Sequence, residues 1–150
     1  MSESPDKKLV HSITIPIRWG DMDAFGHVNN TVYFRYMEQA RVEWLAWLGC
    51  IDQASGQTPV VVNAFCNFKK PLTYPGMVEV CTYVGQIGRS SVETFYELRL
   101  TEDGFTVYAD GGAKIVWMDN QTGKSVALPE NLKSKLSEIA ARQLGPKLHL

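Results

Sequence analysis

The sequence predicts an α+β protein in which the helices and the strands occupy separate parts of the chain. An apolar stripe at helical spacing runs through residues 31–48, and a second helical pattern covers residues 129–143. Between them lie runs of alternating or β-branched residues with the composition of strands. At 150 residues, and without an internal repeat or a linker, the chain is expected to form one domain, 1–150.

The first strand is expected at residues 13–19, where large apolar residues alternate with polar residues or proline. The long helix follows, with Asn29 or Asn30 as a suitable N-cap and Gly49 as a natural stop. One face of this helix is predicted to be buried. Its stripe comprises Tyr33, Met37, Ala40, Trp44 and Trp47.

Four further strands are expected after the long helix, separated by turns rich in glycine and polar residues. Their ranges are 59–68, 77–86, 92–100 and 105–118. Residues 1–8 carry no periodic apolar pattern and are expected to form a flexible N-terminal extension.

Composition excludes several classes of protein. A net charge of −1 gives no general attraction to nucleic acid or to an anionic membrane. No apolar run approaches the length needed to cross a bilayer, and the N-terminus lacks the apolar core of a signal peptide. The cysteines Cys50, Cys66 and Cys81 are an odd set without a CxxC pair, which favours a reducing compartment. We therefore expect a cytoplasmic protein without nucleic-acid or membrane partners.

Two acids, Asp21 and Asp23, stand directly before the long helix. They continue the odd-numbered phase of the first strand, which would direct both carboxylates toward its buried side. The first N–H groups of a helix lack intrahelical partners and lie at the positive end of the helix dipole. An acyl oxyanion could bind there, within reach of an acid a few residues upstream.

The run Asp21-x-Asp23-x-x-Gly26-His27-Val28-Asn29-Asn30, with Tyr33 and the later Tyr36-Met37-Glu38-x-Ala40-Arg41, resembles the signature of the hotdog-fold thioesterases. It is similar specifically to the 4-hydroxybenzoyl-CoA thioesterase-like acyl-CoA thioesterases. The segments Phe68-Lys69-Lys70-Pro71 and Gly88-Arg89-Ser90-Ser91 also resemble that family. The His-Val-Asn-Asn sequence replaces apolar and aromatic residues of the hydroxybenzoyl-CoA enzymes, so an aromatic substrate does not follow.

The resemblance implies a hotdog fold, with one long central helix wrapped by an antiparallel sheet of about five strands and a short C-terminal helix. It implies an enzyme that hydrolyses acyl-CoA to free acid and CoA and that assembles as a homodimer or homotetramer. No cofactor is expected, because coenzyme A is part of the substrate. No metal is expected either, since neither an HExxH motif nor a Cys/His spacing is present.

Site residues are carried over position by position. Asp23 matches the catalytic aspartate, as nucleophile or as general base, and Asn30 matches the position whose backbone N–H polarises the thioester carbonyl. His27 and Asn29 are expected to order the helix entrance or to position substrate and water. The expected CoA contacts are Lys70, Arg89, Ser90 and Ser91, and the expected acyl-pocket residues are Phe25, Tyr33 and Tyr36.

Other interpretations remain open from the sequence. Asp21 is expected to cap backbone donors or to pair with Arg18. Glu38 is a competing catalytic acid, but it lies roughly 12 Å past Asn30 along the helix axis, and a pairing with Arg41 explains it without catalysis. An acyl-carrier-protein thioesterase and a non-catalytic acyl-CoA-binding module are the alternative functions. The acyl chain length and the physiological substrate are not determined.

Overall fold

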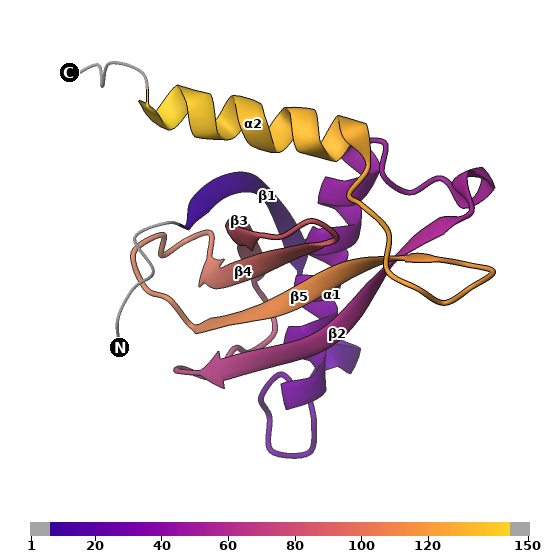
Figure 1. Ribbon diagram of the computed structural model, residues 1–150. Coiled ribbons are helices and arrows are strands. Elements are labelled where there is room, and N and C mark those ends of the chain that lie inside the picture. Colours follow the sequence, from indigo (N-terminus) through magenta and orange to yellow (C-terminus); the bar gives the residue numbers. More distant parts are fainter. Residues whose placement is uncertain (1–6, 145–150) are drawn as a thin grey trace.

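The computed structural model describes residues 7–144, with side chains for residues 7–141. Its five strands form one antiparallel sheet in the order β1-β3-β4-β5-β2. The strands are β1 (Lys8–Pro16), β2 (Gln57–Phe68), β3 (Met77–Ile87), β4 (Ser91–Leu100) and β5 (Ala109–Asp119). The helices are α1 (Asn30–Trp47) and α2 (Glu130–Leu144), with short 3-10 turns η1 (Trp19–Asp21) and η2 (Gln53–Ser55). The predicted α+β hotdog arrangement is confirmed (Figure 1).

Helix α1 packs on one face of the sheet and contacts β1, β2 and β3. It begins where Asn29 accepts a hydrogen bond from the Thr31 N–H at 2.9 Å, so Asn29 is the N-cap. It ends before Gly49, whose φ of 73° is a conformation that a side chain disfavours. The predicted helix is thus confirmed to within one residue at each end.

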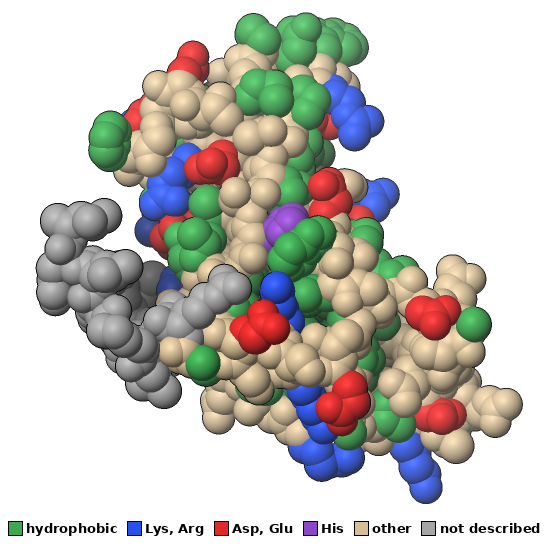
Figure 2. Space-filling view, turned by 90° about the horizontal axis from the view of Figure 1, so that it is seen from above, with side chains coloured by type: hydrophobic (Ala, Val, Ile, Leu, Met, Phe, Trp, Pro, Cys, Tyr) green, Lys and Arg blue, Asp and Glu red, His purple; other side chains and the backbone are tan. Residues whose placement is uncertain are grey.

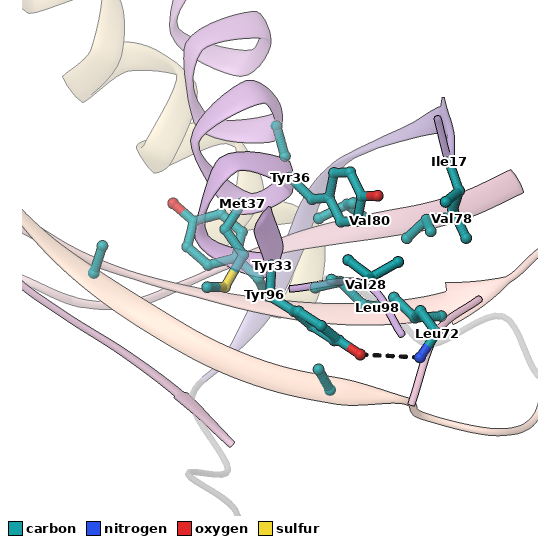
Figure 3. Packing of buried hydrophobic residues seen from close by; sticks show 13 residues of the cluster. Ile17, Val28, Tyr33, Tyr36, Met37, Leu72, Val78, Val80, Tyr96 and Leu98 are labelled. Carbon is teal, nitrogen blue, oxygen red and sulfur yellow. Dashed lines mark hydrogen bonds between the residues drawn. The ribbon is translucent and has the colours of Figure 1, made fainter. Parts of the chain in front are cut away.

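Two apolar clusters lie beneath α1. The first packs the N-terminal half of α1 on β3 and β4, and Figure 3 shows its side chains: Tyr33, Tyr36, Met37, Val78, Val80, Tyr96 and Leu98 among others. The second packs the C-terminal half of α1 against α2 and the sheet: Trp44, Leu45, Val84, Val92, Trp117, Leu132 and Leu136 among others. Helix α2, across the top of Figure 1, therefore closes one end of the core.

The predicted burial of Trp47 is wrong, because its side chain is 60% exposed. Trp47 lies in the last turn of α1, where its ring contacts His11 of β1 at a centroid distance of 5.7 Å. The ammonium of Lys135 from α2 lies 4.9 Å from the same ring. The indole thus bridges three elements at the surface instead of entering the core.

The first strand differs from its predicted range. Strand β1 begins at Lys8, so only residues 1–6 of the expected extension lie outside the described residues. It ends at Pro16, and Trp19 lies in η1 with 75% of its surface exposed. The prediction that the first strand extends to Trp19 is therefore wrong. The chain turns here because Asp21 accepts a hydrogen bond from the Arg18 N–H at 2.9 Å, which favours the 3-10 turn over an extended strand.

The last strand is also shorter than predicted. Strand β5 begins at Ala109, and Phe105 lies in the preceding loop with 97% of its surface exposed. The Asp103 carboxylate accepts hydrogen bonds from the Phe105 and Thr106 N–H groups, each at 3.2 Å. This local turn removes both N–H groups from the sheet ladder.

The surface shows no large region of one charge in the view of Figure 2, where acidic and basic side chains are interspersed among polar and apolar ones. Within residues 7–144, no helix has the length and the apolar character required to span a bilayer.

Candidate functional site

A tight turn between η1 and α1 carries Asp23. The Gly26 N–H donates to the Asp23 carbonyl at 3.0 Å, and the Asp23 N–H donates to the His27 carbonyl at 2.9 Å. Gly26 has a φ of 80°, so glycine suits this turn where a side chain would be strained. The Asp23 carboxylate accepts from the Phe25 N–H at 2.9 Å through Oδ1. The local sequence therefore fixes the direction of this half-buried carboxylate.

Asn29 connects that carboxylate to the helix. Its Nδ2 donates to Oδ2 of Asp23 at 3.4 Å, and its Oδ1 accepts from the Thr31 N–H at 2.9 Å and from the Thr31 hydroxyl at 2.7 Å. The cap and the Asp23 contact thus use the two ends of one amide. Asn30 is the first helical residue, and its N–H has no acceptor among the described residues. An unused donor therefore lies at the positive end of α1.

Asp21 has a structural position, as expected. Its Oδ2 accepts from the Tyr36 hydroxyl at 2.8 Å and from the Arg18 N–H at 2.9 Å, and its carbonyl accepts from the Asn29 N–H at 3.0 Å. Burial and the hydrogen bond to Asp21 raise the pKa of Tyr36 above its ordinary value. These contacts tie the end of the first strand to the start of α1.

A cavity of about 290 Å³ opens beside the start of α1. It brings together four of the predicted site residues: His27, Asn30, Tyr33 and Lys70. Val28, Phe68, Lys69 and Pro71 complete its wall. Asp23 does not line this cavity, but its N–H bonds the carbonyl of His27, which does.

Tyr33 connects the cavity to the loop after β2. Its hydroxyl accepts from the Leu72 N–H at 3.0 Å, the dashed line in Figure 3. The Val28 N–H donates to the Leu72 carbonyl at 2.8 Å. Burial is the main cause that raises the pKa of Tyr33 above its usual value. The hydroxyl therefore holds the loop that carries Lys70 against the helix start.

The turn Gly88–Ser91 does not join this cavity within one chain. Its backbone accepts from Trp117 and Leu128, at the end of the sheet that α2 covers. Lys70, in contrast, lies beside Tyr108 and the end of β4 near Leu98. The seven residue steps of β4 from Ser91 to Leu98 span roughly 20 Å. Within a single chain, the four expected CoA contacts are therefore not brought together, because Lys70 lies at the other end of the sheet from the Gly88–Ser91 turn.

The three predicted acyl-pocket residues are also separated. Phe25 is 88% exposed at the tip of its turn, and Tyr36 is buried in the first cluster on the side of Asp21. Tyr33 is the one that lines the cavity at the helix start. The sequence reasoning missed Phe68, whose ring meets Tyr33 edge-on at 5.0 Å. Its place at the aromatic end of β2, two residues before Lys70, was the signal that could have identified it.

Two further cavities continue along α1 beside β2, with volumes of about 420 and 630 Å³. Both are lined by Glu38, Arg41 and Val61. The predicted pairing of Glu38 with Arg41 is wrong, because Glu38 pairs with Arg35 at 2.8 Å and Arg41 turns to the Tyr96 hydroxyl at 3.4 Å. In the described part of the chain, no three His, Cys, Asp or Glu residues are grouped to hold a metal ion.

The sequence profile of the Thioesterase-like superfamily matches residues 17–136, from the Asp21–Asn30 motif through α1 and the sheet into α2. The chain belongs to this superfamily. Its reaction class is therefore thioester hydrolysis.

Solved structures and curated relatives agree with this membership in the Thioesterase-like superfamily. The PA2801 protein of Pseudomonas aeruginosa, described as a candidate thioesterase, is 38% identical and superposes with a TM-score of 0.83 over 86% of this chain and 99% of that one. A candidate acyl-CoA thioesterase of Xanthomonas campestris is 38% identical, with a TM-score of 0.70 over 79% of this chain and 100% of that one. The long-chain acyl-CoA thioesterase FadM of Escherichia coli is 28% identical over 83% of this chain and 96% of its own.

Proposed function

We propose that the protein hydrolyses acyl-CoA thioesters to free acid and CoA, with Asp23 as the reacting carboxylate and the Asn30 N–H as the donor to the carbonyl oxygen. One observation carries this proposal: a carboxylate fixed by the Phe25 N–H and by the Asn29 amide lies beside a helix start with an unused N–H. The cavity along Asn30 gives space for a ligand at that N–H. The names of the relatives, which include acyl-CoA thioesterases, support the substrate class.

The geometry suits a thioester. The carbonyl oxygen accepts from the Asn30 N–H, where the helix dipole stabilises the negative charge that develops in the transition state. Asp23 then attacks the carbonyl carbon and expels CoA thiolate, giving an anhydride that water hydrolyses, or it takes a proton from the attacking water. A single turnover in isotopically labelled water tests for the anhydride route, since label in the Asp23 carboxylate requires water to attack the Asp23 carbonyl of the anhydride.

We also propose that the chain acts as a homodimer or homotetramer. Strand β2 is at the edge of the sheet, with one row of backbone groups unpaired. Its exposed apolar residues are Val60, Val61, Val62, Phe65 and Phe68. A second copy that packs on β2 would cover this edge and these apolar side chains. Light scattering on the purified protein tests it, and a monomer at micromolar concentration would contradict it.

The test of the function is a panel of short, medium, long and aromatic acyl-CoAs, with release of free thiol as the measurement. Asp23→Asn is expected to lower turnover by about 10²- to 10⁴-fold. The matched control is Asp119→Asn, because Asp119 also caps a turn, accepting from the N–H groups of Gln121 and Thr122, but lies far from the cavity. Normal turnover by the Asp23 variant would overturn the assignment.

A carrier comparison completes the test. The same acyl groups are presented on CoA and on acyl carrier protein, and kcat/KM is measured for each pair. A higher kcat/KM for the CoA thioesters supports the proposal. A clearly higher kcat/KM for the carrier-protein thioesters would identify acyl carrier protein, and not CoA, as the carrier of the substrate.

A further inference from the structure

Arg41 lies on the side of α1 that faces β2, three turns after Asn30. It is half-buried and lines the cavity of about 420 Å³ between α1 and the sheet. The apolar wall of that cavity comes from Phe34, Met37, Val61, Ala64 and Tyr96. A guanidinium therefore projects into a mainly apolar space that the proposed chemistry at Asp23 does not use.

A chain of buried hydroxyls holds this guanidinium in place. Nη1 of Arg41 donates to the Tyr96 hydroxyl at 3.4 Å, and the guanidinium carbon lies 5.9 Å from the centroid of the Tyr96 ring. The Tyr96 and Thr94 hydroxyls are 2.7 Å apart, and Thr94 donates to the Ala113 carbonyl at 2.8 Å. Because Thr94 has a single proton, Tyr96 donates to Thr94 and accepts from Arg41. Among the described residues, one of the five guanidinium donors of Arg41 has an acceptor, which leaves the other four for a ligand.

The charges around Arg41 favour an anion. Within residues 7–144 no carboxylate lies at ion-pair distance from Arg41, since Glu38 pairs with Arg35. The charged side chains that line the 420 Å³ cavity are Arg35, Arg41 and Glu38, so positive charge is in excess. A fixed planar guanidinium without an acid partner matches a carboxylate through two parallel hydrogen bonds.

The position of Arg41 matches the far end of an acyl chain. One stripe along α1 carries Asn30, Phe34, Met37 and Arg41 in that order. Arg41 lies about 16 Å beyond Asn30 along the helix axis. Phe34 contacts Phe68, which lines the cavity at the helix start, at a centroid distance of 6.5 Å. An acyl group with its carbonyl at Asn30 would thus pass Phe34 and Met37 before it reaches Arg41.

The next cavity makes a less suitable end point for an anion. It contains Asp52 and Glu38 against the single guanidinium of Arg41, so negative charge is in excess there. An anionic chain end that has passed Met37 is therefore best placed at Arg41 itself.

We propose that Arg41 is a specificity-determining residue that binds a carboxylate at the far end of the acyl chain, and that the preferred substrates are CoA monothioesters of linear dicarboxylic acids. This inference rests on the proposed function, because it takes Asn30 as the site of the thioester carbonyl. The free acid produced is then a dicarboxylate.

The experiment compares two series of CoA thioesters of equal chain length, one of monocarboxylic and one of dicarboxylic acids. In Arg41→Met the long apolar stem is kept and the charge is lost. We expect kcat/KM for the dicarboxylic series to fall by roughly ten- to several-hundredfold in this variant, with little change for the methyl-ended series. Tyr96→Phe should cause a smaller loss of the same selectivity, because the guanidinium stays but its anchor is removed. Lys133→Met, which removes an exposed cation of α2, is the control and should leave the selectivity unchanged.

Two outcomes would overturn the inference: a wild-type preference for the methyl-ended series at every length, or an equal loss on both series in Arg41→Met. Thermal unfolding of each variant by circular dichroism shows whether it folds, and Arg41→Lys replaces a variant that does not. Non-hydrolysable thioether analogues separate this inference from the proposed function. If no thioester is cleaved, the proposed function fails. Tighter binding of the dicarboxylic analogue by wild type than by Arg41→Met would still support the role of Arg41, and equal binding would refute it.

Discussion

The two ends of α1 are built in different ways. At the N-terminal end, the carboxylates of Asp21 and Asp23 accept hydrogen bonds that fix their directions, one of them donated by Asn29, and the Asn30 N–H has no acceptor among the described residues. At the C-terminal end, Trp44 and Leu45 are packed among apolar side chains of α2 and the sheet. Hydrogen bonds select directions and leave donors for a ligand, whereas apolar packing is non-directional and contributes most of the stability. Chemistry and stability are thus assigned to opposite ends of one helix.

The largest expected effect comes from shortening a buried side chain at the C-terminal end of α1, where α2 packs. Leu132 of α2 is fully buried, and Leu132→Ala should lower the free energy of unfolding by about 2–5 kcal/mol. Denaturant unfolding measures this loss. Turnover per folded molecule should stay near the wild-type value, because Leu132 is remote from Asp23. A turnover loss as large as that of Asp23→Asn would show that the two ends are not independent.

Two buried threonines, Thr94 and Thr82, are expected to change the free energy of unfolding by smaller amounts and in opposite directions. Thr94 and Thr82 are both buried, but the Thr94 hydroxyl bonds Tyr96 and Ala113, whereas the Thr82 hydroxyl has no partner among the described residues. Thr94→Val should cost about 1–3 kcal/mol because it leaves buried partners unpaired. Thr82→Val should stabilise the fold by about 1 kcal/mol because it removes an unpaired hydroxyl. Equal shifts in the denaturant midpoint of the two variants would contradict this.

At the N-terminal end of α1, two substitutions of Asn29 distinguish its role as the helix cap from its contact with Asp23. Asn29→Ala removes the cap and should cost roughly 0.5–2 kcal/mol. Asn29→Asp keeps a cap oxygen, so stability should be retained, but it places a second carboxylate against Asp23 in place of the amide donor. Like charges favour the protonated acid, so the acid limb of the pH–rate profile should move to higher pH. An unchanged profile would show that the Asn29 contact does not act on Asp23.

The smallest expected effect on stability comes from Glu97 of β4, which lies at neither end of α1. Burial alone would raise the pKa of Glu97, but hydrogen bonds from Tyr83 at 2.7 Å and Arg99 at 3.0 Å outweigh it and hold the pKa below its usual range. Burial and the same contact raise the pKa of Tyr83 to about 12. Since the folded pKa of Glu97 is below the unfolded value of about 4.3, its contribution is present above that value and is lost as pH falls through the folded pKa.

Glu97→Gln should therefore lower stability at neutral pH and flatten the acid limb of the stability curve. Urea unfolding at a series of pH values measures this slope. A variant with the same acid limb as wild type would show that Glu97 does not contribute to it.

Local sequence patterns were sufficient for much of the fold. The 3.6-residue period placed α1 to within one residue at each end, and Asn29 and Gly49 marked its boundaries. Alternating and β-branched runs predicted the five strands, although the first and the last differ from their predicted ranges. The failures at Trp19 and Phe105 share one cause, because in each case an aspartate caps nearby N–H groups and ends the extended conformation.

The sequence by itself determined which residues surround the start of α1, because Asp23, Asn29 and Asn30 lie within eight positions and short-range hydrogen bonds fix their geometry. Only the tertiary structure decided the contacts between distant positions. It brought Lys70 to the helix start, placed the Arg89 turn at the other end of the sheet, and paired Arg41 with Tyr96 across 55 residues. Periodicity specifies which face of an element is buried, but it does not specify which side chain of another element lies opposite, since that depends on how the strands pair.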